Sequence, residues 1–329
     1  MAEHRPSESP ADAAGGEIGT RVAKTFDVLG NKTRLAILLA LWDAYDPHGT
    51  DDAVRFTELR DQIGIRQGAQ FNYHLTKLMD HFVTKDDSGY RLTPIGRKFV
   101  QTIIADTMDE SNLEPTEIAV PCHICDGTTA IAYQGGYLYH LCLQCDGRLG
   151  PGSVFDEGRL FIEPFPSSAL STRPPRELFT DGVITLLLIK VMKLVGLCPR
   201  CSGEIEASVH LCRDHHPGEM SVCQACGVRE EVRVRWGCSV CKYRGGTSPA
   251  EAIITHPTVV SFYHDHGIDI NYKFRDFETA RRLRELMMSH EQVIVQDDPL
   301  QVEVTVKIAD EVMTLMVDEE LTVREVTRG

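Results

Sequence analysis

Five CxxC pairs contain ten of the eleven cysteines of this 329-residue chain, and they constrain the fold more than any other feature. An odd number of cysteines cannot be used up in disulfides, and a reducing cytosol favours metal binding over disulfide formation. One CxxC turn supplies two thiolates, so two turns complete the tetrahedron of ligands around a structural zinc ion. The pairs are Cys122 and Cys125, Cys142 and Cys145, Cys198 and Cys201, Cys223 and Cys226, and Cys238 and Cys241.

The order of these pairs along the chain predicts two zinc ribbons. Between the first two pairs, the segment TAIAYQGGYLYH alternates around a Gly-Gly turn as a β-hairpin does, and VREEVRVRW alternates between the last two pairs. We therefore expect one ribbon with the ligands Cys122, Cys125, Cys142 and Cys145, and another with the ligands Cys223, Cys226, Cys238 and Cys241.

Three cysteines are left for a third metal site. Cys198, Cys201 and Cys212 need one more ligand, and His215 stands at the CxxH spacing from Cys212. Two alternatives stay open at this point. His216 could replace His215, and Cys198 and Cys201 could instead pair with Cys223 and Cys226. The sequence thus predicts two to three structural zinc ions (Zn2+) per chain.

The metal sites do not indicate an enzyme. Sites of four cysteines are closed, whereas catalytic zinc keeps one coordination position open. The sequence shows no nucleophile, paired carboxylates or phosphate-binding loop at a motif's spacing. In the string YHDH, His264 and His266 could form an extra ligand pair, but a polar helix end is the simpler interpretation.

Charge is distributed unevenly along the chain. The net charge is −14, with 48 acidic and 34 basic residues, and the basic residues are mostly arginine. This balance resembles that of proteins from salt-loving organisms, in which negative charge keeps the surface solvated. Residues 20–105, however, contain 12 basic and 10 acidic residues, a net charge of +2. The first part of the chain is therefore compatible with a nucleic-acid partner.

The pattern of residues 20–106 predicts helices followed by a hairpin and a closing helix. The runs FDVLGNKTRLAILLAL and FTELRDQIGI are helical, and Asn31 is placed to cap the helix that follows it. A further helix over 67–81 carries one apolar stripe, FVTKDDSGYRLT alternates as a hairpin, and PIGRKFVQTIIA closes the region. Together with QFNYHLTKLMDHFV and GYRLTPIGRKFV, these runs resemble the winged helix-turn-helix of ArsR-type transcriptional regulators, particularly those of halophilic archaea.

The resemblance implies that the partner of this region is double-stranded DNA. The exposed face of the helix over 67–81 would enter the major groove with Gln67, Gln70, Tyr73 and Lys77, and phosphates would be contacted by Arg66, Lys85 and Arg91. ArsR-type metal sensors usually carry cysteine ligands in this region, whereas residues 1–121 contain no cysteine. Metal sensing by this helix is therefore not expected.

The predicted fold class is α+β and multidomain, with a winged helix, small zinc-ribbon β modules and a small C-terminal α+β unit. The apolar run 183–195 is too short and too charged to cross a bilayer, and a secretion signal is missing, so we expect a cytoplasmic protein without a membrane partner. The predicted segments are a disordered tail (1–19), the winged helix (20–106), a linker (107–118), the first ribbon (119–165), a second linker (166–175), a helix (176–196), the remaining zinc-binding modules (197–246) and the α+β unit (250–329).

These expectations combine into a DNA-binding transcriptional regulator whose zinc ribbons are structural. The C-terminal unit would bind a protein partner or form a homodimer. Two alternatives remain at the level of the sequence. One is a basal factor that acts through RNA polymerase, since archaeal transcription factor E also joins a winged helix to a zinc ribbon. The other is a zinc-stabilised scaffold for protein interactions that makes no contact with DNA.

Overall fold

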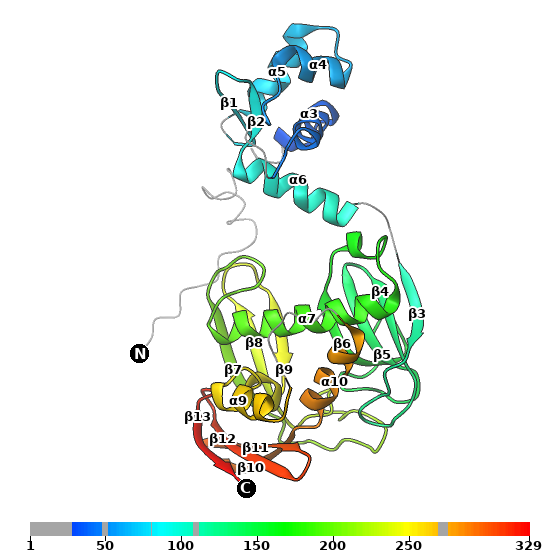
Figure 1. Cartoon of the computed structure of the whole chain (residues 1–329), viewed down its shortest axis with the longest axis vertical. Coiled ribbons are helices and arrows are strands. Elements are labelled where there is room, and N and C mark those ends of the chain that lie inside the picture. Colours follow the sequence, from blue (N-terminus) through cyan, green and yellow to red (C-terminus); the bar gives the residue numbers. More distant parts are fainter. Residues whose placement is uncertain (1–27, 48–51, 80, 108–111, 269–275) are drawn as a thin grey trace. The chain divides into compact units, whose positions relative to one another are not determined.

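The computed structural model describes residues 28–47, 52–79, 81–107, 112–268 and 276–329 (Figure 1). The predicted tail at 1–19 lies outside these residues. The chain divides into two compact units, Met1–Met108 (unit 1) and Asp109–Gly329 (unit 2). Both α-helices and small antiparallel sheets are present, as the predicted α+β class requires.

Unit 1 is built from helices and one short hairpin. The side chain of Asn31 accepts hydrogen bonds from the N–H groups of Thr33 and Arg34 and so caps the first described helix. The next helix ends at Gly64, whose left-handed conformation suits glycine. The elements are α3 (Lys32–Asp43), α4 (Phe56–Ile63), α5 (Gly68–Leu78), β1 (Val83–Lys85), β2 (Tyr90–Leu92) and α6 (Pro94–Thr107).

The core of unit 1 is apolar. The predicted stripe of α5 is buried: Phe71, Leu75 and Leu78 pack against Leu38 of α3 and Leu59 of α4. Each such side chain contributes about 1.5–3 kcal/mol when it leaves water. α6 packs tightly behind the hairpin, because a Cβ atom at Gly96 would lie 2.1 Å from the carbonyl oxygen of Phe82. Only glycine fits at that position.

Unit 2 contains three antiparallel sheets and several helices. The first sheet has the order β3-β4-β5-β6, the second β7-β8-β9 and the third β10-β11-β12-β13. The strands are β3 (Leu113–Ile118), β4 (Thr129–Gln134), β5 (Tyr137–Cys142), β6 (Gly158–Pro164), β7 (Ile205–Leu211), β8 (Val232–Cys238), β9 (Arg244–Thr247), β10 (Glu291–Asp297), β11 (Leu300–Ile308), β12 (Glu311–Asp318) and β13 (Val323–Arg328). The helices are η1 (Ser167–Ala169), α7 (Pro175–Leu194), α8 (Pro249–Ala252), α9 (Pro257–Asp265) and α10 (Phe277–Met288).

The predicted linker 107–118 is partly wrong. Its second half forms β3, an edge strand that pairs with β4 and buries Ile118. Glu114 and Glu117 occupy exposed positions of this strand, and Pro115 is tolerated because an edge strand leaves one side unpaired. The second predicted linker contains the single turn η1, and α7 then covers most of the helix predicted over 176–196.

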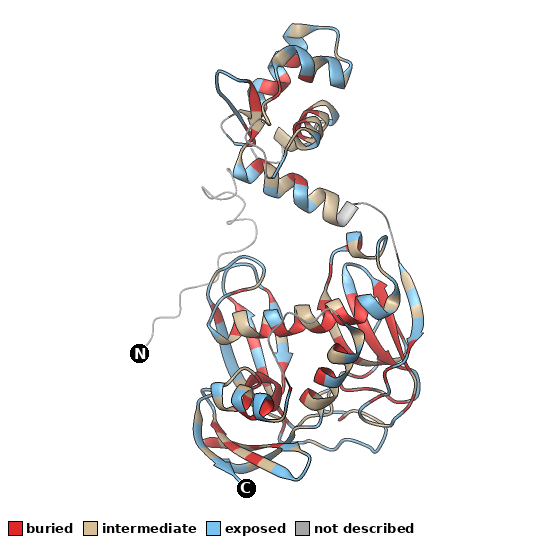
Figure 2. Ribbon diagram, viewed as in Figure 1, coloured by how far each residue is buried: buried red, intermediate tan, exposed pale blue. Residues whose placement is uncertain are grey.

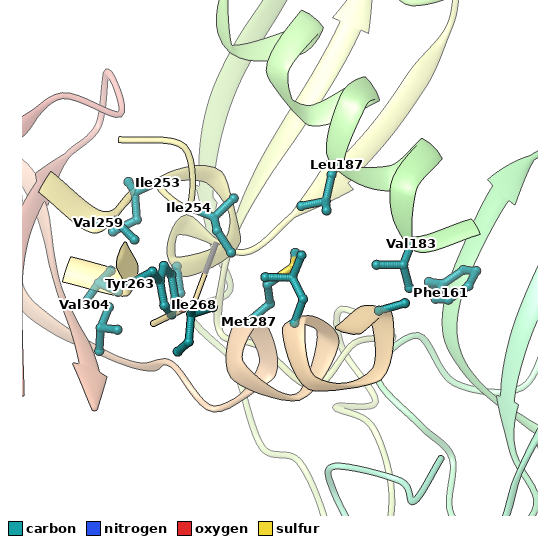
Figure 3. Close-up of a cluster of buried hydrophobic side chains, with 14 of the residues drawn as sticks. Phe161, Val183, Leu187, Ile253, Ile254, Val259, Tyr263, Ile268, Met287 and Val304 are labelled. Atoms are coloured by element: carbon teal, nitrogen blue, oxygen red, sulfur yellow. The ribbon is translucent and has the colours of Figure 1, made fainter. Parts of the chain in front are cut away.

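The C-terminal region does not form a unit of its own, contrary to the prediction for 250–329. One apolar core joins the first sheet, α7, α9, α10 and the third sheet. Figure 3 shows part of this core, in which Phe161 of β6 lies beside Val183 of α7, Leu187 of α7 lies near Met287 of α10, and Tyr263 of α9 lies near Val304 of β11. Figure 2 shows the buried positions along α7 and inside the sheets. Separate folding of the last 80 residues would expose this shared surface.

α7 also contains most of the apolar run 183–195. Both of its lysines, Lys190 and Lys193, are buried in unit 2. Among the described residues, no helix has the combination of length and apolar composition that crossing a bilayer would require.

Candidate metal centres

All eleven cysteines and His215 gather into three groups of four, and within each group the ligand atoms lie within 4.8 Å of one another. We name the groups cluster 1, cluster 2 and cluster 3. Each is therefore compact enough to hold one metal ion. Cluster 1 consists of Cys122, Cys125, Cys142 and Cys145, cluster 2 of Cys198, Cys201, Cys238 and Cys241, and cluster 3 of Cys212, His215, Cys223 and Cys226.

Cluster 1 has the composition that the sequence predicted. The turn before β4 brings in the first pair of cysteines, and the end of β5 brings in the second pair. The Sγ atoms of Cys122 and Cys145 are 3.9 Å apart, and those of Cys125 and Cys142 are 3.6 Å apart. Zinc–sulfur bonds of about 2.3 Å at the tetrahedral angle separate two sulfurs by about 3.8 Å. The spacing of these thiols therefore suits a tetrahedral ion.

Backbone N–H groups point at the sulfurs of cluster 1. Cys142 accepts hydrogen bonds from the N–H groups of Gln144 and Cys145, both at 3.4 Å, and Cys145 accepts one from Gly147, also at 3.4 Å. Such bonds stabilise thiolates. β6 passes so close that a Cβ atom at Gly158 would lie 1.9 Å from the carbonyl oxygen of Cys145. Glycine is required for this approach.

The predicted pairing of the other cysteines is wrong, because β7 and β8 form one hairpin with a metal cluster at each end. Ile205 pairs with Cys238 at one end of the hairpin, and Leu211 pairs with Val232 at the other. The turn before β7 therefore meets the turn after β8, and cluster 2 forms there. The two ends of these seven-residue strands are separated by about 20 Å. Neither the predicted second ribbon nor the alternative pairing of Cys198 and Cys201 with Cys223 and Cys226 can span that distance.

Cluster 2 is more exposed than cluster 1. Its sulfurs approach as closely as those of cluster 1: Cys198 and Cys241 are 3.6 Å apart, as are Cys201 and Cys238. Cys198 and Cys238 are buried, whereas Cys201 and Cys241 are exposed. The pKa of Cys238 is lowered to about 7, mainly because its Sγ atom accepts a hydrogen bond from the N–H group of Cys241.

Cluster 3 uses His215, as predicted, rather than His216. The Nδ1 atom of His215 lies 3.5 Å from the Sγ atom of Cys226, and its Nε2 atom lies 3.0 Å from the carbonyl oxygen of Arg229. A hydrogen bond from Nε2–H to that carbonyl leaves Nδ1 as the metal ligand. His216 contributes its backbone N–H instead, which is the main cause that lowers the pKa of Cys223 to about 6.

Burial opposes ionisation of other ligand thiols. It raises the pKa of Cys122 to about 11, and it raises the pKa of Cys226 to about 11. These thiols would be protonated at neutral pH without a cation beside them. A divalent metal deprotonates coordinating thiols outright, so the clusters have the chemistry of metal sites and not of free thiols.

Clusters 1 and 3 are linked through the residues that follow their ligands. The N–H group of Asp146 donates to the carbonyl oxygen of Met220, and that of Arg229 donates to the carbonyl oxygen of Arg148, both at 3.0 Å. The Nε atom of Arg229 donates to the carbonyl oxygen of Gly147 at 3.1 Å. Each loop thus holds the other in the conformation that presents its cysteines.

A buried ion network centred on Glu251 lies behind these loops. Lys190 and Arg284 donate to its Oε1 atom at 2.9 Å and 3.0 Å, and Arg148 and Thr247 donate to its Oε2 atom at 3.0 Å and 2.8 Å. Burial alone would raise the pKa of Glu251, but the three cations hold it well below its usual value. The sequence pattern did not reveal this network. Its local signal was the presence of Lys190 and Lys193 inside the apolar run 183–195.

The residues predicted to contact DNA lie in unit 1, and most of them are exposed. Gln67 precedes α5 as its N-cap residue, and Gln70, Tyr73 and Lys77 are exposed along it. The Nζ atom of Lys77 lies 5.8 Å from the centre of the Tyr73 ring. Arg66 is exposed before α5, and Lys85 is exposed on β1.

Arg91 differs from the other predicted contacts. Its Nε atom lies 2.6 Å from Asp52, and its Nη1 atom is paired with Asp86. These two carboxylates neutralise the guanidinium, so it joins β2 to two neighbouring loops. Arg91 is therefore not available as a free cation for phosphate binding.

The histidines of the YHDH string lie outside the three clusters. His264 is exposed near the end of α9, and the Nδ1 atom of His266 lies 2.7 Å from the carbonyl oxygen of Phe262. Among the described residues, neither belongs to a group of potential metal ligands.

Two family models match the chain. A domain of unknown function (DUF7351) matches residues 119–323, which include all three clusters, and a domain of unknown function (DUF7347) matches residues 22–103. No curated protein and no solved structure matches the chain. The two matched segments fall within unit 2 and unit 1 respectively.

Proposed function

We propose that this chain, which belongs to the DUF7351 family of domains of unknown function, is a DNA-binding regulator of transcription whose unit 2 is held by three zinc ions. Unit 1 would act as a winged helix-turn-helix, with α5 as the recognition helix and β1 and β2 as the wing. A cytoplasmic location fits this proposal, because a reducing compartment keeps the ligand thiols available.

The observation that carries the proposal is the division of α5 into two faces. Phe71, Leu75 and Leu78 are buried, while Gln70, Tyr73 and Lys77 stand at spacings of three and four residues on the exposed side. Glutamine reads adenine and lysine reads guanine through hydrogen bonds to base edges in the major groove. An exposed tyrosine amid these groups, at 56% exposure, serves an interface better than a solvated surface.

Phosphate contacts are assigned to Arg66 and Lys85. Arg91 is left out because Asp52 and Asp86 already neutralise it. Few phosphate contacts imply a shallow dependence of affinity on salt, since each one releases about one counterion. With a net charge of only +2 over residues 20–105, most of the affinity would come from base contacts and shape.

The test compares two matched double variants in binding to genomic DNA fragments enriched by the wild type. Gln70→Ala with Lys77→Ala should weaken binding roughly 30-fold or more, because each base contact discriminates by about 1–3 kcal/mol. The control, Lys98→Ala with Gln101→Ala, removes the same two residue types from exposed positions of α6 and should change binding less than about twofold. Equal binding by both variants would remove the role of α5.

Zinc is proposed as the metal because thiolate-rich tetrahedral groups select it among the common divalent ions. Metal analysis of the purified protein should give three zinc ions per chain. Removing one ligand of cluster 3, as in Cys223→Ser, should lower the number to two. A single ion per chain in the wild type would refute this assignment.

A protein-interaction scaffold is the second candidate, and exposed apolar side chains near cluster 2 favour it. Val240 is 68% exposed between two ligands of this cluster, and Val195 is 73% exposed just before it. Such side chains commonly mark contacts with other proteins. If DNA binding is absent and these valines are needed to retain a polymerase subunit or other protein, the scaffold or the basal factor becomes the better description.

A further inference from the structure

A small cavity lies inside unit 2, where elements far apart in sequence converge. Its volume is about 50 Å³, and its walls come from β6, β8, β9, α7, α8, α10 and the loop after cluster 1. A cavity holds a water molecule once it offers roughly 10–15 Å³ to the centre of a water-sized probe. This one therefore has room for a small ion or for several waters.

Positive charge dominates the walls of this cavity. Four cations line it, namely Arg148, Lys190, Arg233 and Arg284, but only two carboxylates, Glu163 and Glu251. Two further charged side chains, Lys193 and Glu230, adjoin the same network and are also largely buried. Counting all of these groups, five cations face three carboxylates, and the side chain of none is more than 18% exposed. An excess of two positive charges is thus enclosed in protein.

Not every donor of these cations finds an acceptor. Glu251 already accepts four hydrogen bonds, from Lys190, Arg284, Arg148 and Thr247. Within the described residues, the Nε atom of Arg284 and the Nη1 atom of Arg233 are buried without a hydrogen-bond partner, although Nη1 of Arg233 forms a long ion pair of 3.9 Å with Oε2 of Glu230. Arg284 itself is only 3% exposed. A buried donor without an acceptor is unfavourable, so the Nε atom of Arg284 above all calls for a further acceptor.

The ionisation of the surrounding groups agrees with this excess. Burial lowers the pKa of Lys190 to about 8 despite the nearby Glu251, because Arg284 and Arg148 repel the ammonium. Burial also raises the pKa of Glu163. The lowered pKa of Lys190 reduces the positive excess, whereas the raised pKa of Glu163 weakens the negative charge that opposes it, so an excess of positive charge remains.

We propose that this cavity is a binding site for one small inorganic anion, held by Arg233, Arg284 and Lys190. Chloride and phosphate share the required chemistry, since guanidinium and ammonium groups bind both. The anion would join β6, β8, α7 and α10, and unit 2 would become more stable as its concentration rises. This site does not depend on DNA binding by unit 1.

Thermal unfolding of the full-length, zinc-loaded protein tests the proposal. Sodium chloride or sodium phosphate is titrated at constant ionic strength against sodium gluconate, whose anion is too large for the cavity. We expect the melting temperature of unit 2 to rise to a plateau with at least one of the two anions. Arg233→Gln should shift the midpoint of this rise about tenfold higher in concentration. The matched control is Arg235→Gln, which lies on the same strand, is exposed and does not line the cavity.

The outcomes separate a specific site from a general salt effect. A rise without a plateau for both anions, or the same midpoint in Arg233→Gln as in the wild type, would overturn the proposal. Crystals of the wild type grown in bromide give an independent readout. An anomalous peak beside Arg233 and Arg284 would support the site, and ordered water alone at that position would refute it.

Discussion

Unit 1 packs its helices and hairpin around apolar side chains and contains no cysteine, whereas unit 2 adds metal clusters and a buried ion network to an apolar core. The burial of α5 on α3 and α4 needs only the hydrophobic effect. In unit 2, by contrast, cysteine clusters compact enough for metal ions connect the loops, and three cations share the buried carboxylate of Glu251. The two units should therefore respond differently to the same change in solution.

Metal removal should show the largest difference between the units. A structural zinc ion contributes on the order of 10–16 kcal/mol in small zinc domains, so a strong chelator should unfold unit 2 while the helices and hairpin of unit 1 keep their structure. Amide hydrogen exchange followed by mass spectrometry would report both units in one experiment. Added zinc should restore protection in unit 2. If chelation leaves unit 2 protected, the metal clusters do not organise this part of the chain.

The substitution Glu251→Gln should have the next largest effect. It keeps the shape of the side chain but leaves Arg148, Lys190 and Arg284 without their shared carboxylate, which costs about 3–5 kcal/mol for a buried ionic group. Chemical denaturation should show this loss in unit 2 and none in unit 1. The control is Glu325→Gln at an exposed position of β13, where a change within about 0.5 kcal/mol is expected. A loss as small as that of the control would show that the network contributes little.

A smaller effect should separate the metal clusters from one another. Arg229→Gln removes the side-chain bonds to the carbonyl oxygens of Gly147 and Glu219. Because these bonds connect clusters 1 and 3, zinc affinity should fall by about tenfold at both, as second-shell changes commonly do, and stay unchanged at cluster 2.

Alkylation of released cysteines during competition with a chelator would assign each loss to its cluster. Arg213→Gln is the matched control, because the Arg213 side chain is 74% exposed and its ion pair with Asp297 is long, at 3.9 Å. Equal losses at all three clusters, or a loss at cluster 1 or 3 alone, would contradict the coupling.

A further predicted effect depends on pH. The pKa of Lys190 falls from 10.5 to about 8 on folding, with burial as the main cause. Between pH 8 and 10.5 the unfolded chain keeps a proton that the folded chain has released, so the stability of the wild type rises with pH there. Relative to Lys190→Met, the wild type should gain up to about 1.4 kcal/mol per pH unit in this interval. The control is Lys307→Met, which removes a half-exposed lysine of β11. A constant difference for both variants would show that Lys190 titrates normally.

Local sequence patterns predicted much of this protein correctly. The apolar stripe of α5, the cap at Asn31 and the hairpin between Cys125 and Cys142 depend on residues a few positions apart, and the structure contains each of them. All twelve predicted metal ligands lie in the three clusters, because a CxxC turn brings its two thiols together whatever the rest of the chain does. The winged helix and its DNA contacts stay predictions.

The pairing of the clusters needed the tertiary structure. Cys223 and Cys226 are near Cys238 and Cys241 in the sequence, but the register of β7 and β8 places the two pairs at opposite ends of one hairpin. Likewise, the strand at 113–118 was hidden because an acidic edge strand looks like a linker until β4 lies beside it.

Charge partners were equally invisible in the sequence. Arg91 looked like a phosphate contact, but Asp52, 39 positions away, neutralises it. Arg148 and Glu251 meet across 103 positions. Sequence alone determined the turns, caps and amphipathic faces, whose interactions span a single turn of chain. The tertiary structure decided which cysteines share a metal and which charges share the interior, because those energies depend on distances in space that residue order does not specify.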